Sequence, residues 1–173
     1  MTRTEERWLF EMAGGVLNVG YSSRDWRAKL LSNFAPTPFR LWGEDFTSVE
    51  GFWQGLKFEE GSPEQKRVFS LYAYEAKRAG KAASKKPGDT FRWKGKEYVV
   101  GSPEHQNLML QALRAKFSQN PEAKKALLAT RGLSLVHELP RDSKTIPGAT
   151  FAAMLEQVRE ELSADTGGEA AVS

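Results

Sequence analysis

Two patterns of side chains share one segment near residue 50. Apolar side chains recur there at the i, i+3, i+4, i+7 spacing of a helix with one buried face, namely at Val49, Phe52, Trp53 and Leu56. Glu50, Gln54 and Lys57 recur at i, i+4, i+7 and therefore share a different face. Residues 47–58 are thus predicted to form a helix that presents an acid, an amide and an amine to a cleft.

The same residues also allow a purely structural role for Glu50. Thr47, followed three residues later by Glu50, fits a capping box in which the carboxylate reaches back to an unpaired backbone N–H. Lys57 would then be a solvated charge. Gly51 and Gly55 each cost roughly 1 kcal/mol relative to alanine inside a helix, which indicates that a partner helix or a ligand packs close to the backbone.

The rest of the chain alternates between short strand patterns and helix patterns. Strands are predicted where apolar and aromatic residues lie between turn residues, at 16–21, 39–42, 91–93, 97–100 and 133–137. Helices are predicted after Ser-Pro, Asn-Pro and Thr starts, at 63–76, 103–117, 121–129 and 151–162. Residues 22–27 are predicted to be a loop. We therefore expect an α+β fold, mostly helices around a few short strands.

The pattern divides the chain into three parts. Residues 1–15 form an N-terminal extension with an amphipathic lead-in at 8–12, and residues 16–162 form a single domain. Residues 163–173 are small and polar and are expected to be disordered. The chain start lacks the apolar core of a signal peptide, and no run of about 18 apolar residues occurs. A cytoplasmic location is therefore the default expectation.

The amino-acid composition limits which catalytic and metal-binding groups the protein can use. The 173 residues include no cysteine, which excludes disulfides, thiolate catalysis and cysteine zinc sites. His105 and His137 are the only imidazoles and lie in separate segments, so we expect neither a metal site nor a cofactor. The net charge of +3 is compatible with phosphate-bearing ligands. Lysines and arginines are in local excess between Lys77 and Lys96, which is either a solvated loop or an anion-facing patch.

Several motifs occur in a recognisable order along the chain. The helix segment carries Ser48-x-Glu50, an aromatic pair, Gln54 and Lys57-Phe58, and it follows Ser32-Asn33-Phe34. Downstream come Ala76 to Lys81, then a helix that begins at Met109 and ends in Ala115-Lys116-Phe117, and then Leu135-Val136. Over residues 16–162 this order resembles the YbiA/NADAR family, the NAD- and ADP-ribose-associated domains.

The resemblance implies an α+β protein that hydrolyses N-glycosidic bonds, either in ribosylated pyrimidine intermediates or in ADP-ribose attached to guanine. Breaking such a bond gives carbon 1 of the ribose oxocarbenium character, so a carboxylate is needed beside it. The resemblance assigns that role to Glu50 and a second acid role to Asp142, although Asp142 alone also fits a loop Asx residue. Lys57 would hold a phosphate or hydroxyl, or attack an opened ribose as an imine-forming nucleophile, and we favour the electrostatic role.

The resemblance also implies a set of substrate-binding residues on the same motifs. These are Asn33, Phe34, Ser48, Trp53, Gln54, Arg78 and Lys116. Trp93, the tryptophan nearest to a missing family position, joins them as a second candidate beside Trp53 to stack on the base, although both tryptophans also fit the core. We expect Glu50, Lys57 and the loop that contains Asp142 to converge on one pocket, with Trp53 or Phe34 in its wall. The expected partner is a small-molecule nucleotide or an ADP-ribosylated base, or a modified nucleic acid, with no membrane partner.

The motifs depart from the family pattern near the expected ligand. The family tryptophan before the Met109 helix is missing near Gly101, and a Trp-Gly pair after the second acid is replaced by residues 144–148. His137-Glu138 follows Val136 where the family has Glu directly. These departures motivate an alternative, a non-catalytic binder of nucleotide or ADP-ribose. A third alternative is a nucleic-acid-binding module that uses the basic patch between Lys77 and Lys96.

Overall fold

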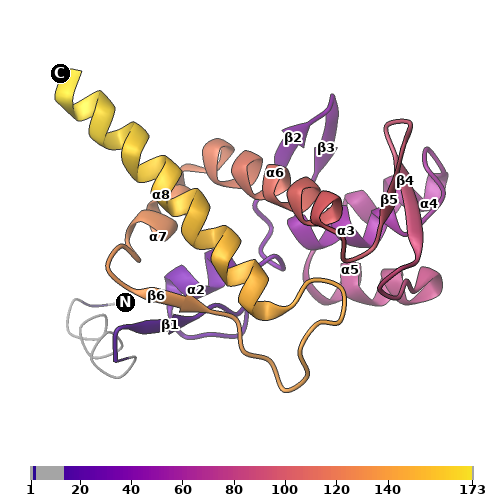
Figure 1. Cartoon of the computed structure of the whole chain (residues 1–173), viewed down its shortest axis with the longest axis horizontal. Helices are drawn as coiled ribbons and strands as arrows, with labels where there is room; N and C mark the ends of the chain where they lie inside the picture. Colours follow the sequence, from indigo (N-terminus) through magenta and orange to yellow (C-terminus); the bar gives the residue numbers. More distant parts are fainter. Residues whose placement is uncertain (1, 3–13, 173) are drawn as a thin grey trace.

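The computed structural model describes Thr2 and residues 14–172. The predicted amphipathic lead-in at 8–12 lies outside the described residues. The strands form three small two-stranded sheets, and the helices gather around them (Figure 1). The architecture is therefore the predicted α+β fold in one domain.

The first and last strands of the domain pair with each other. β1 (Val16–Asn18) and β6 (Ser134–Val136) are parallel, with Leu17 opposite Leu135. The Val19 amide donates to the Val136 carbonyl at 2.8 Å and extends the pairing by one step. The other pairs are hairpins, in which β2 (Phe39–Leu41) pairs with β3 (Glu44–Phe46) and β4 (Thr90–Trp93) pairs with β5 (Lys96–Val99).

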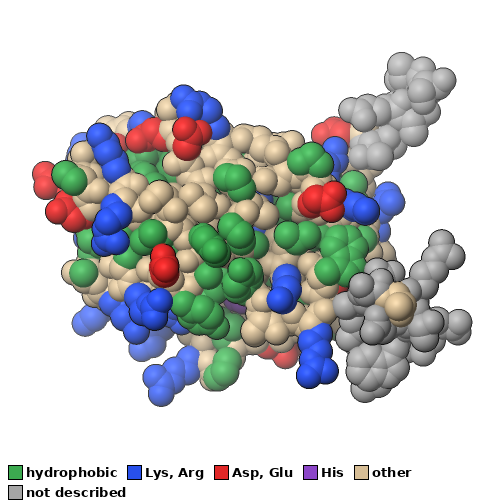
Figure 2. All heavy atoms as spheres, turned by 180° about the vertical axis from the view of Figure 1, so that it is seen from behind, with side chains coloured by type: hydrophobic (Ala, Val, Ile, Leu, Met, Phe, Trp, Pro, Cys, Tyr) green, Lys and Arg blue, Asp and Glu red, His purple; other side chains and the backbone are tan. Residues whose placement is uncertain are grey.

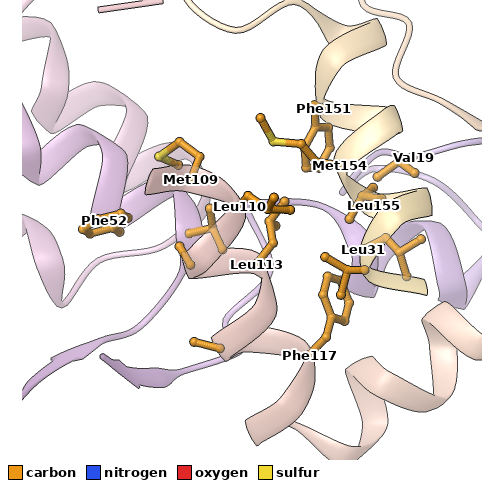
Figure 3. Packing of buried hydrophobic residues seen from close by; sticks show 14 of the residues in the cluster. Val19, Leu31, Phe52, Met109, Leu110, Leu113, Phe117, Phe151, Met154 and Leu155 are labelled. Carbon is orange, nitrogen blue, oxygen red and sulfur yellow. The ribbon is translucent and has the colours of Figure 1, made fainter. Parts of the chain in front are cut away.

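The helices bury one core between them. In chain order they are α2 (Trp26–Leu31), α3 (Val49–Leu56), α4 (Pro63–Phe69), α5 (Ala73–Gly80), the 3-10 turn η1 (Lys81–Ala83), α6 (Pro103–Gln119), α7 (Pro121–Leu128) and α8 (Gly148–Val172). Figure 3 shows Leu113 and Phe117 of α6 near Leu31 of α2. Phe151 and Leu155 of α8 belong to the same core cluster. α6 is thus a central helix, packed against α3, α7, α8, β2 and β5.

The predicted loop 22–27 and the predicted helix 63–76 both differ from the structure. α2 occupies the end of the predicted loop and the residues that follow it, and it begins because the Asp25 carboxylate accepts from the Arg27 amide at 2.8 Å. The predicted helix 63–76 is split into α4 and α5, with Ala73 in left-handed backbone (φ 51°) at the start of α5. The carbonyls freed by this break receive hydrogen bonds from the start of α3, which stabilises the split.

The last helix is longer than expected. α8 begins at Gly148 and remains helical to Val172, so it includes most of the segment for which disorder was expected. Figure 1 shows its end projecting beyond the body of the domain. The segment contains no proline, and its alanines and glutamates favour helix. In the described part of the chain, none of the helices combines the length and the hydropathy that a membrane crossing requires.

Candidate functional site

The start of α3 is capped by Ser48, one residue later than predicted. The Ser48 hydroxyl accepts from the Gly51 amide at 2.8 Å and donates to the Leu71 carbonyl at 2.9 Å. Ser48 is fully buried and does not line the cavity described below. The prediction of a Thr47–Glu50 capping box is therefore wrong, and Glu50 is free of a capping role.

The side chain of Glu50 is instead held along the predicted polar face. Gln54, one turn later, donates from Nε2 to Glu50 Oε1 at 2.8 Å. The pKa of Glu50 is raised because burial removes the carboxylate from water, while the Gln54 hydrogen bond and the charges of Lys57 and Lys77 oppose that shift. The carboxylate of Glu50 is thus held in an environment that removes it from water.

Glu50 opens into a cavity of about 480 Å³. This volume lies in the range of cavities that bind small molecules. The wall is mostly apolar and includes Phe34, Trp53, Tyr74, Met109, Leu113, Phe151 and Met154. The polar and charged groups include Asn33, Glu50, Gln54, Lys57, Lys77, His137 and Arg141. Figure 2 shows a hollow rimmed by hydrophobic side chains, with a histidine at its floor and basic side chains around it.

The charges of the cavity favour an anionic ligand. Among the described residues, Glu50 is the only carboxylate in its lining, whereas Lys57, Lys77 and Arg141 bring three cations. Lys57 Nζ lies 5.2 Å from the centre of the Trp53 ring. Burial lowers the pKa of Lys57, and the nearby charge of Glu50 opposes that shift. The three cations of the lining can therefore neutralise the charge of a bound phosphate, while the carboxylate of Glu50 keeps one negative charge at a defined position in the cavity.

The loop 32–34 forms one rim of the cavity and is held from behind. Lys116 Nζ donates to the Ser32 carbonyl at 2.8 Å, and the Ala73 amide donates to the Phe34 carbonyl at 3.1 Å. The Asn33 amide accepts no hydrogen bond through Oδ1 in the described structure, although that atom is buried. Asn33 thus brings an unused acceptor to the cavity lining.

Lys116 does not line the cavity, contrary to the role expected for it. Its side chain is completely buried, and burial lowers its pKa to about 7. Its position on the inner face of α6 explains the difference, because the ammonium reaches the main chain of the rim rather than the open space. Lys116 supports the site without touching a ligand there.

Asp142 also lies outside the cavity lining, although its neighbours Arg141 and Ser143 are in it. Its Oδ1 accepts from the amides of Ser143 at 2.9 Å and Gly148 at 2.8 Å. The carboxylate therefore caps the start of α8 and is otherwise exposed. The loop of Asp142 reaches the cavity as expected, but the acid itself does not.

Two other expected ligand contacts are absent from the lining. Trp93 is 2% exposed and packs edge-on against Phe69 and Phe52, with ring centres 5.5 and 6.0 Å away. Arg78 is exposed, whereas Lys77 lines the cavity. Successive residues on a helix point about 100° apart, so α5 can present only one of these two cations to the site.

The structure adds residues to the site that the sequence analysis did not include. Lys77 and Tyr74 come from α5, and His137 and Arg141 come from the segment between β6 and α8. The sequence presents His137 as an imidazole without a metal partner and as part of a departure from the family pattern, and its place as the last residue of the predicted strand 133–137 is the available signal. Arg141 offered no signal, because the direction of a loop side chain depends on how the loop closes.

The fold defines the class of the protein. The NMR structure of the Escherichia coli protein YbiA matches with a TM-score of 0.63, covering 87% of this chain and 86% of YbiA. The identity over this match is 24%. The chain therefore has a YbiA-like fold, as the motif order predicted.

The sequence comparisons narrow the class to a family. Residues 25–160 match the family model described as bacteriophage protein GP30.3. The chain is also 32% identical over 142 residues to the uncharacterized 17.1 kDa protein in the Gp30-rIII intergenic region of Enterobacteria phage T4. That match covers 79% of this chain and 93% of the phage protein. The chain belongs to the GP30.3 family, which is of the NADAR type.

Proposed function

We propose that the protein is an N-glycosidase that hydrolyses the bond between ribose, or ADP-ribose, and a nitrogen base. The observation that carries this proposal is the position of Glu50, a desolvated carboxylate that caps nothing and opens into a cavity with three cations. An acidic residue with a purely structural role does not need a desolvated position in a cavity. The NADAR-type family supports the same class of reaction.

The reaction requires negative charge next to carbon 1 of the ribose while the bond to nitrogen lengthens. Glu50 supplies that charge and takes a proton from the attacking water. The Gln54 hydrogen bond holds the carboxylate in one orientation, so the charge is in place before the substrate arrives. Lys57, one turn beyond Gln54, acts electrostatically on a phosphate or a sugar hydroxyl.

The test combines a substrate screen with a charge-removing variant. Ribosylated pyrimidines, NAD, ADP-ribose and ADP-ribosylated guanosine are incubated with the protein, and the free base is measured. Glu50→Gln keeps the size of the side chain but removes its charge, and we expect a loss of about 10²-fold or more in rate. Glu104→Gln is the matched control, because Glu104 holds the same second position in α6 and is exposed.

Equal rates of base release by wild type and Glu50→Gln would contradict the role of Glu50. The absence of base release from every substrate would contradict the proposed activity as a whole. Folding of each variant is checked by its thermal unfolding midpoint, so that loss of structure is not read as loss of chemistry.

A second candidate function is a non-catalytic binder of nucleotide or ADP-ribose. It is favoured by the capping role of Asp142, because the described lining then holds one carboxylate instead of the two that the family resemblance implied. Calorimetry with ADP-ribose distinguishes the two functions. Saturable binding with unchanged ligand afterwards supports a binder, and release of free base from a ribosylated ligand supports the enzyme.

A further inference from the structure

His137 is held rigidly at the end of β6. Its Nδ1 lies 2.8 Å from the Val19 carbonyl, and its ring meets the Phe151 ring edge-on with centres 5.0 Å apart. The carbonyl of His137 packs against the start of α8 so closely that a Cβ on Gly148 would lie 2.1 Å from it. The backbone and ring of His137 therefore have one orientation.

The hydrogen bond to Val19 determines what the other ring nitrogen can do. A carbonyl oxygen only accepts, so Nδ1 carries a proton in both the neutral and the cationic imidazole. Nε2 is then the atom that gains or loses a proton. It has no hydrogen-bond partner among residues 14–172, and His137 lines the cavity. His105 differs, because it is fully buried and its Nδ1 accepts from the Gly101 amide.

His137 and Glu50 reach the cavity from different parts of the fold. Glu50 comes from α3, whereas His137 follows β6, and Figure 1 shows these two elements well apart. The other charged groups of the lining are Lys57 and Lys77 near Glu50, and Arg141 in the loop after β6. Arginine cannot give up its proton in a protein. The hydroxyls of Ser143 and Thr145, also in the lining, hydrogen-bond to each other. His137 is therefore the ionisable side chain after β6 in this lining that is able to transfer a proton.

We propose that His137 is the general acid that protonates the departing base, a role that rests on the proposed N-glycosidase function. As the bond between carbon 1 and nitrogen breaks, its electron pair stays on nitrogen and takes the proton from Nε2 of the imidazolium. Water adds its oxygen to carbon 1 and gives one proton to Glu50. The products are free ribose and neutral base, and both side chains then exchange protons with solvent to return to their starting states.

The test uses leaving groups that differ in their need for a proton. Nicotinamide leaves nicotinamide riboside as a neutral molecule without protonation, whereas hypoxanthine must be protonated to leave inosine. His137→Asn keeps an amide donor for the Val19 carbonyl and lacks Nε2. We expect this variant to hydrolyse inosine or another purine riboside about 10²-fold more slowly, and nicotinamide riboside at less than about threefold below the wild-type rate.

Equal slowing of both substrates, or of neither, would overturn the role of His137, since damage to the fold affects all leaving groups alike. Glu138→Gln is the matched control, because Glu138 is the next residue and is exposed. We expect it to retain the wild-type rates with both substrates.

A second measurement separates this inference from the proposed function. The chain contains two histidines, so loss of one imidazole signal in His137→Asn assigns the NMR spectrum. If no substrate is hydrolysed, the proposed function fails, and free hypoxanthine and guanine are added to the wild type. A shift of the His137 ring signals that is absent for His105 supports a base placed against His137, and unchanged signals overturn it.

Discussion

The ammonium of Lys116 donates a hydrogen bond of 2.8 Å to the main-chain oxygen of Ser32, across 84 residues of sequence. Among the described residues, no carboxylate pairs with it. A buried cation with a single carbonyl partner is expensive for the fold. The cavity rim is thus held by a group whose charge works against stability.

The first prediction follows from the titration of Lys116. Burial lowers its pKa from 10.5 to about 7, so between these pH values the unfolded chain binds a proton that the folded chain does not. The free energy of unfolding therefore rises with pH across this window, by roughly 1.4 kcal/mol per unit. Lys116→Met lacks this rise. We expect the variant to be more stable than wild type at pH 6 and less stable at pH 10.5, measured by urea unfolding.

Other groups titrate equally in both proteins, so the difference between the two curves isolates Lys116. Lys125→Met is the control, because Lys125 is exposed on α7, and its difference from wild type should be small at every pH. A constant difference between wild type and Lys116→Met from pH 6 to pH 10.5 would contradict the assignment.

The second prediction concerns the stability cost of Glu50. Because burial raises its pKa, the folded protein keeps a proton that the unfolded chain releases, and stability falls as pH rises from 4.5 through the folded pKa. Glu50→Gln should stabilise the protein by about 1 kcal/mol at pH 8 and have less effect at pH 4.5. Chemical unfolding at the two pH values gives both numbers. A variant that is less stable than wild type at pH 8 would show that Glu50 is structural.

The third prediction tests the close packing of α3. A Cβ on Gly51 would lie 2.4 Å from the Leu71 carbonyl, and one on Gly55 would lie 2.4 Å from the Phe69 ring. The partner that the two glycines indicated is thus the α4–α5 unit and not a ligand. Gly51→Ala should destabilise the protein by about 1–3 kcal/mol, although alanine favours helix by roughly 1 kcal/mol. Gly20→Ala, which meets open space, should change the unfolding midpoint little.

The fourth prediction separates the two roles considered for Asp142. Asp142→Asn keeps an oxygen for the Gly148 amide, whereas Asp142→Ala removes it. A capping role predicts that only the alanine variant loses stability, by about 1 kcal/mol, and that Asp142→Asn retains the base-release rate. Loss of that rate in Asp142→Asn with an unchanged unfolding midpoint would restore the second acid role.

The sequence was most informative where a site residue lies on a regular element. The spacing of Glu50, Gln54 and Lys57 places them on one helix face, and the structure brings all three to the cavity. Lys116 and Trp93 show the limit of this reasoning. The burial of each depends on elements distant in sequence, so a charge or a tryptophan in a motif does not reveal which way it faces.

The same limit explains why the sequence indicated Asp142 as a site residue whereas the structure places His137 in the cavity lining. Both residues follow β6, and the sequence alone does not tell which of their side chains reaches the cavity. The Gly148 amide takes the carboxylate of Asp142, while the Val19 carbonyl fixes the ring of His137. These two contacts form only when β6 pairs with β1 and α8 starts where it does, and neither event is encoded in the local pattern.

The pairing of β1 with β6 determines when the cavity can form during synthesis of the chain. Val19 and His137 are 118 residues apart. A ribosome that adds roughly 5–20 residues per second needs roughly 6 to 24 s to bridge that interval. Until then α3 can form with Glu50 on its polar face, but β1 has no partner and the far wall is missing. The nascent chain therefore carries an incomplete cavity for most of its elongation, and the cavity closes only when nearly the whole domain has been synthesised.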